Sequence, residues 1–220
     1  NYGSDPRVFI YAQDLETFDL YHAGSQSRFT FKTLMRQTQS AYWWYFSDDE
    51  ILSPLTAAAM TGVLTPVLGA RNVNYVNALH LATGRGIKLT TTLQPPREDY
   101  AKFLEIVLET EEQKVHVAGA LLGEQHHPRI VQIDGYELSV KPERCLIVLR
   151  NNDVPGVIGR VGTLLAQHGL NIAEYIQSRE AEGGLALAAV SVDSKVSPDF
   201  LETLSEDDDI LDARAVYFGA

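Results

Sequence analysis

The chain has 220 residues, 45% of them hydrophobic, which is enough to bury one large core or two small ones. Its formal net charge of −11 repels phosphate backbones and anionic lipid, so neither nucleic acid nor a membrane surface is expected as a partner. No apolar run approaches the ~20 residues of a membrane span, no signal peptide is visible, and the lone Cys145 excludes an internal disulfide, all of which favours a cytoplasmic protein.

The N-terminal segment, residues 1–50, is rich in aromatic side chains and gives no clear domain pattern. Short strands are expected at 8–11 and 18–21, the start of a helix at 29–35 and a strand at 41–46. Burial explains the last of these best, because large aromatic side chains are usually buried, although a partner-facing surface explains it too. The segment is left unassigned and is a candidate first part of the domain that follows.

Residues 51–141 are predicted to form one α/β domain. Ser53 and Pro54 have the N-cap and first-turn pattern of a helix start, followed by apolar residues at helical spacing, and the helix runs toward residue 68. The expected face consists of Leu55, Ala58, Ala59 and Val63. A strand at 73–76, a short helix at 78–82 ended by Gly84, and strands at 88–93, 103–110, 115–122, 129–133 and 136–140 complete the domain. The Asp134-Gly135 pair between the last two strands is a strong hairpin signal.

Residues 144–220 show the clearest pattern, after a charged linker at 141–144. The expected elements are a strand at 145–150, a helix at 155–168 capped by Gly169, strands at 171–177 and 185–192, a helix from the cap Ser197 through Leu204, and a strand at 210–218. The first helix is expected to turn one face inward, consisting of Val157, Ile158, Val161, Leu164 and Leu165. The order β-α-β-β-α-β predicts a ferredoxin-like domain, and the fold class is therefore α/β (α+β).

Motifs for catalysis, cofactors and metals are missing. The nearest fragment to G-x-G-x-x-G is Gly84-Arg85-Gly86, but Leu89 stands where the third glycine belongs, and neither a P-loop nor G-x-S-x-G occurs. His126 and His127 are adjacent in a loop, with no cysteine or further histidine at ligand spacing, which favours a solvated loop over a metal site.

The lone cysteine and an acidic run are both expected to have structural roles. Cys145 opens an apolar strand, so a packed thiol is expected rather than a nucleophile. The acidic run 206–209 is interpreted as a solvated turn before the last strand. The sequence thus predicts no catalytic residue, no metal and no cofactor in this chain.

Residues 150–159, where the first strand of the second domain turns into its first helix, have the chemistry of a small-molecule site. The helix N-terminus would offer N–H groups around Val157 and Ile158 to a carboxylate. Asp153 can cap that helix and also accept from an ammonium group, and Asn171, beyond the other end of the helix, offers a donor and an acceptor. These groups suit an amino acid, although a well-capped turn explains them equally well.

The segments 149–165 and 169–173 carry a resemblance to the ACT domain, a βαββαβ module that binds amino acids between paired copies; the resemblance covers residues 144–218. Upstream, the sequence resembles the intervening domain of the long-form D-3-phosphoglycerate dehydrogenase family. The segments that carry this second resemblance are 55–59, 66–69, 73–78, 85–87, 117–123 and 128–136.

The resemblance implies the regulatory region of an NAD-dependent enzyme of serine biosynthesis that is feedback-inhibited by L-serine. The catalytic and NAD-binding domains would lie outside this chain, which would form a homodimer or tetramer. The implied L-serine contacts are Asn151, Asn152, Asp153, Pro155, Val157, Ile158 and Asn171. A basic anion site of some members falls on Arg129 and Lys141, with Tyr136 where some members have another basic residue.

Two other functions stay open at this point. The regulatory subunit of an iron–sulfur L-serine dehydratase has a similar two-domain plan, but a Ser/His-rich motif would be expected near its N-terminus and residues 1–50 have none. A free-standing amino-acid sensor that signals to a partner protein is the other alternative.

Overall fold

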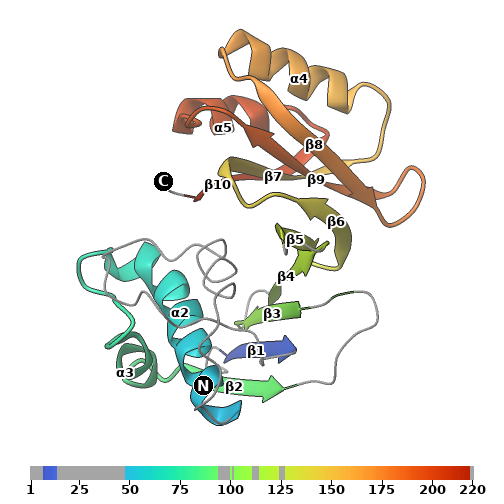
Figure 1. Ribbon diagram of the computed structural model, residues 1–220. Coiled ribbons are helices and arrows are strands. Elements are labelled where there is room, and N and C mark those ends of the chain that lie inside the picture. The colour runs from blue at the N-terminus through green and yellow to red at the C-terminus, as the bar shows by residue number, and fades with distance from the viewer. Residues whose placement is uncertain are drawn as a thin grey trace, which may run out of the picture. The chain divides into compact units, whose positions relative to one another are not determined.

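The computed structural model describes residues 7–13, 48–93, 100, 102–110, 114–123 and 127–218 (Figure 1). By packing, the chain divides into two compact units, Asn1–Asp134 and Gly135–Ala220. The elements expected at 18–21, 29–35 and 41–46, and the histidine at 126, lie outside the described residues.

The first unit contains the helices α2 (Asp48–Leu68) and α3 (Ala78–Thr83). The predicted start of α2 was wrong: the helix begins at Asp48, so Ser53 and Pro54 lie inside it. Asp48, Asp49 and Glu50 occupy its first positions, where acidic residues are common in helices. The predicted end of α3 is confirmed, since Gly84 is its C-cap.

The middle of α2 is buried on several sides and not only along the predicted stripe. Leu55, Ala58 and Ala59 are buried as expected, but so are Thr56 and Thr61. The Thr61 hydroxyl donates to the Ala57 carbonyl at 2.8 Å, which satisfies a polar group that would otherwise be buried without a partner. The core around this helix also includes Leu104 and Leu121, from two strands of the neighbouring sheet.

The strand expected at 73–76 is a turn instead. The side chain of Asn74 accepts from the N–H groups of Val76 at 2.9 Å and of Asn77 at 3.1 Å. The Asn77 side chain in turn accepts from the Asn74 N–H at 2.8 Å. Asparagine side chains that bond nearby backbone in this way compete with a strand ladder, which explains the difference.

Strands β1 (Arg7–Gln13), β2 (Lys88–Leu93), β3 (Lys102–Glu109), β4 (Lys114–Leu122), β5 (His127–Ile133) and β6 (Tyr136–Val140) form a sheet in the order β2-β1-β3-β4-β5-β6. β1 is parallel to β2, and the pairs β1–β3, β3–β4 and β4–β5 are antiparallel. The predicted hairpin of β5 and β6 is confirmed, because the two strands are neighbours in the sheet. It turns at Asp134 (φ 48°) and Gly135 (φ 90°), in the left-handed backbone region that the Asp-Gly signal predicts.

The second unit contains β7 (Arg144–Asn152), α4 (Val157–Gln167), β8 (Ile172–Arg179), β9 (Leu185–Val192), α5 (Pro198–Ser205) and β10 (Ile210–Phe218). Its sheet has the order β10-β7-β9-β8, with antiparallel neighbours throughout. This confirms the predicted ferredoxin-like fold.

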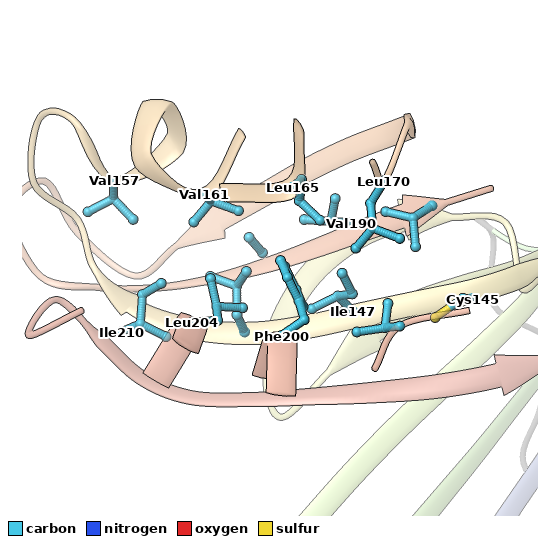
Figure 2. Packing of buried hydrophobic residues seen from close by; sticks show 14 residues of the cluster. Cys145, Ile147, Val157, Val161, Leu165, Leu170, Val190, Phe200, Leu204 and Ile210 are labelled. Carbon is cyan, nitrogen blue, oxygen red and sulfur yellow. The ribbon is translucent and has the colours of Figure 1, made fainter. Parts of the chain in front are cut away.

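Both helices of the second unit pack on one face of its sheet (Figure 2). α4 contributes Val157, Val161 and Leu165 to this core, and α5 contributes Phe200 and Leu204. Leu164 is partly buried against it. The expectation that Ile158 also faces inward was wrong: it is 54% exposed, because it lies about 100° around the helix from Val157.

Ser197 caps α5 as predicted, accepting from the Phe200 N–H at 3.2 Å. We expect Ser197→Ala to lower the free energy of unfolding by about 1 kcal/mol, because that N–H loses its acceptor. Urea unfolding measures this, with Ser205→Ala as control: the Ser205 hydroxyl only bonds the Leu201 carbonyl within the same helix. Equal stability of the two variants would contradict the capping role.

Candidate functional site

The loop between β7 and α4 leaves the helix N-terminus without a side-chain cap. The N-cap is Gly156, whose φ of 98° lies in the left-handed region that favours glycine. A β-carbon there would also lie 3.1 Å from Nη1 of Arg160. The first N–H groups of a helix have no partner within it, so those of Val157 and Ile158 are placed to meet an anion.

The prediction that Asp153 caps α4 was wrong. Its carboxylate accepts instead from Arg179 Nη1 at 2.9 Å, from Gln177 Nε2 at 3.2 Å and from the Gly183 N–H at 3.3 Å. The Arg179 guanidinium holds the pKa of Asp153 below its ordinary value. Asp153 therefore ties the β7–α4 loop to the turn between β8 and β9.

Asn151 is a buried polar side chain with one unused acceptor. It is 1% exposed and follows Cys145, Ile147 and Leu149 in the alternation of β7, so it lies on the sheet face that α4 and α5 cover. Its Nδ2 donates to the Asn152 carbonyl at 2.7 Å, whereas within the described parts of the chain its Oδ1 has no hydrogen-bond partner. A buried acceptor left in this way costs about 1–3 kcal/mol.

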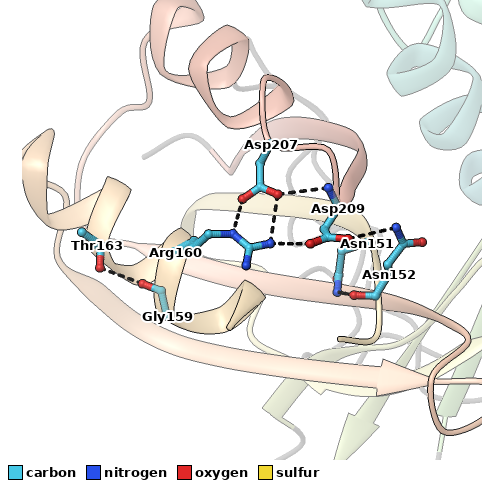
Figure 3. Close-up of polar contacts among 7 residues, drawn as sticks. All are labelled: Asn151, Asn152, Gly159, Arg160, Thr163, Asp207 and Asp209. Atoms are coloured by element: carbon cyan, nitrogen blue, oxygen red, sulfur yellow. Dashed lines mark hydrogen bonds and ion pairs between the residues drawn. The ribbon is translucent and has the colours of Figure 1, made fainter. Parts of the chain in front are cut away.

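Arg160 joins the start of α4 to the turn before β10 (Figure 3). Its guanidinium binds both oxygens of Asp207, at 2.5 and 3.0 Å, and one oxygen of Asp209 at 2.6 Å. Asp209 also accepts from Asn152 Nδ2 at 3.2 Å, and its carbonyl accepts from the Asn152 N–H at 2.8 Å. Arg160 lowers the pKa of Asp207 through these bonds.

The acidic run 206–209 does form the predicted turn, but two of its carboxylates are paired rather than merely solvated. Sequence reasoning missed this role, because the partners are far apart in the chain. Beside the network, a hollow of about 490 Å³ lies between α4 and α5. It is lined by Gly156, Gly159, Arg160, Val161, Thr163, Leu164, Gln167, Thr203, Leu204, Asp207 and Ile210. The predicted L-serine contacts do not line it.

Asn171 is not brought to the β7–α4 loop within one chain. It precedes β8, whose first residue Ile172 pairs with Val192, and Val192 pairs with Cys145 at the start of β7. Asn171 therefore lies at the opposite end of the sheet from Asn152. Its Nδ2 donates to Asp193 at 2.7 Å, and Asp193 also binds Arg144 at 2.6 Å.

The two residues of the expected anion site fall in different units. Arg129 is part of β5 in the first unit. Lys141 follows β6 in the second, where its N–H donates to Glu174 Oε2 at 3.3 Å.

Three other features bear on function: the lone cysteine, the possible metal ligands and the apolarity of the helices. Cys145 is buried, and burial raises the pKa of its thiol, as expected for a packed residue. Among the described residues, no group of three or more His, Cys, Asp or Glu side chains is placed to hold a metal. Within the same part of the chain, no helix is long and apolar enough to cross a bilayer.

Comparison with known protein families gives two matches. Residues 45–134 match the family model of the D-3-phosphoglycerate dehydrogenase intervening domain, and residues 146–209 match that of the ACT domain. A solved ACT domain, from the GTP pyrophosphokinase of Chlorobium tepidum, is 10% identical with a TM-score of 0.29 and covers 34% of this chain and 97% of its own. That similarity is too low to add to the sequence matches.

Curated relatives agree with the family models. The D-3-phosphoglycerate dehydrogenases of Archaeoglobus fulgidus, Methanocaldococcus jannaschii and a Synechocystis strain are 34%, 32% and 32% identical, over 74%, 72% and 74% of this chain. The matched regions make up 31%, 30% and 29% of those proteins, so the chain spans about a third of the length of these relatives.

Proposed function

Because this chain belongs to the D-3-phosphoglycerate dehydrogenase family through its intervening and ACT domains, we propose that it senses L-serine for such an enzyme. The enzyme would be NAD-dependent and would carry its active site in domains other than these. The observation that carries the proposal is the unused Oδ1 acceptor of Asn151, which is buried on the helix-covered face of the sheet. The dehydrogenase matches favour this function over the serine dehydratase subunit.

The loop supplies complementary groups for both ends of a zwitterion. The carboxylate of L-serine takes the N–H groups of Val157 and Ile158 at the uncapped start of α4. Its ammonium group donates to Asn151 Oδ1 and to the carboxylate of Asp153. Asn152 and Pro155 shape the loop between them, since Asn152 is held by Asp209.

Asn171 reaches the same ligand only from a second copy, because one chain places it at the far end of the sheet. The outer strands β8 and β10 each have one edge without a partner in the described sheet, along which copies can pair. Sedimentation equilibrium at micromolar concentration should therefore give at least a dimer. A strict monomer that binds L-serine with full affinity would contradict the shared site.

Isothermal titration calorimetry tests the proposal. The chain should release or absorb heat with L-serine at concentrations up to millimolar, and Asn171→Ala should weaken the binding. The exposed Asn74→Ala change, in the first unit, is the control and should leave the affinity unchanged. No heat with the wild type, or equal affinity in Asn171→Ala, would refute the site.

A further inference from the structure

The proposed ammonium partner, Asp153, is paired with a cationic side chain of the chain itself. Arg179 Nη1 lies 2.9 Å from Asp153 Oδ2, and Gln177 and the Gly183 N–H complete the donors around the carboxylate. A second cation at the same carboxylate would be repelled by the first and would share one negative charge with it. L-serine and Arg179 therefore compete for Asp153.

The exposure of the two side chains shows which group can leave. The Asp153 side chain is 15% exposed and that of Arg179 is 55% exposed, so the arginine can turn into water while the aspartate stays. Arg179 is the last residue of the edge strand β8. The Glu182 carboxylate in the following turn also raises the pKa of Arg179, so a second acidic partner is close by.

The Arg179 contact also fixes the turn between β8 and β9 to the binding loop. This turn is held by the Asp153 carboxylate through Arg179 and the Gly183 N–H, and by a backbone bond of 2.8 Å from the Asp153 N–H to the Gly184 carbonyl. Loss of the Arg179 bond leaves the turn held only by the Gly183 N–H bond and this backbone bond. The turn then opens more often, without unfolding of the domain.

We propose that Arg179 is an affinity-setting residue of the amino-acid site: its guanidinium occupies the position at Asp153 that a ligand ammonium group takes, and it withdraws when the ligand binds. This inference rests on the proposed function. Ligand binding would then also loosen the β8–β9 turn. The mobility of this turn, which lies away from the helix N-terminus, would thus depend on the ligand.

The test is the affinity of Arg179→Gln for L-serine, measured by calorimetry. Glutamine keeps a polar side chain but removes the competing charge. Because an exposed ion pair is worth about 0.2–1 kcal/mol, binding should become about 1.5- to fivefold tighter. The matched control is Arg214→Gln, which removes the same charge from the exposed pair between Arg214 and Asp212. The control should bind like the wild type.

Hydrogen exchange gives an independent readout. In the wild type, L-serine should speed exchange of the Gly183 amide, while Arg179→Gln should show fast exchange there before ligand is added. If the wild type binds L-serine and Arg179→Gln binds equally or more weakly, Arg179 is not a competitor and the inference fails. If wild type, variant and control all fail to bind, the proposed function fails instead.

Discussion

Replacing Asn151 with leucine is expected to leave the fold at least as stable while weakening L-serine binding by roughly tenfold to a hundredfold. The buried Oδ1 has no partner in the described residues, so an apolar side chain of similar size removes a desolvated acceptor. The Asn152 carbonyl that loses Nδ2 still accepts from the Val154 N–H at 2.9 Å. Urea unfolding and calorimetry measure the two effects.

The matched control for this variant is Ser191→Ala. Ser191 is also buried, and its hydroxyl likewise lacks a partner in the described structure, but it pairs with Leu146 near the other end of the sheet. This change should leave L-serine affinity unaltered. A large loss of stability in Asn151→Leu, or an unchanged affinity for L-serine, would show that Asn151 Oδ1 stabilises the fold and does not bind a ligand.

The second large effect is expected on the stability of the second unit when its core residue Phe200 is shortened. Phe200→Ala should lower the free energy of unfolding by about 3–5 kcal/mol, because it leaves a cavity between α5 and the sheet. Phe200 is 1% exposed, and its ring makes a T-shaped contact with the His168 ring at a centroid distance of 5.2 Å. Thermal or urea unfolding of the variant measures the loss.

Leu211→Ala serves as the comparison, since Leu211 is 54% exposed on β10. A surface change of this kind usually stays within about 0.5 kcal/mol. If Phe200→Ala costs no more than Leu211→Ala, the helix–sheet core described for the second unit is wrong.

The helices and strands of the second unit were predictable because the apolar residues of each recur at one regular spacing, that of a helix or that of a strand. β9 and β10 have the predicted bounds, and α5 begins at the predicted proline after its Ser197 cap. In the first unit, the Ser-Pro signal was misleading for α2, because the helix already begins at Asp48 and Pro54 lies inside it, where a proline is normally disfavoured. The strand predicted at 73–76 was wrong because the Asn74 side chain bonds the nearby backbone and forms a turn, which a pattern of apolar residues does not show.

The contacts of the candidate site could not be predicted from the sequence. Helix-start residues and the family resemblance both selected the β7–α4 loop. The partners that decide its chemistry lie far away in the sequence: Arg179 binds Asp153, and Asp207 binds Arg160. Long-range pairs of this kind depend on strand register and helix placement. The burial of Asn151 follows the alternation of β7, but the predicted strand ended at residue 150 and so did not include it.

The most direct test of amino-acid binding at this loop is a titration of the ¹⁵N-labelled chain with L-serine, followed by NMR. The backbone amides of Val157 and Ile158 and the side-chain amide of Asn151 should shift most, with saturation at millimolar ligand or below. Amides of α3 in the first unit should stay in place. No shifts at millimolar L-serine, or saturable shifts that avoid the β7–α4 loop, would contradict the proposed site.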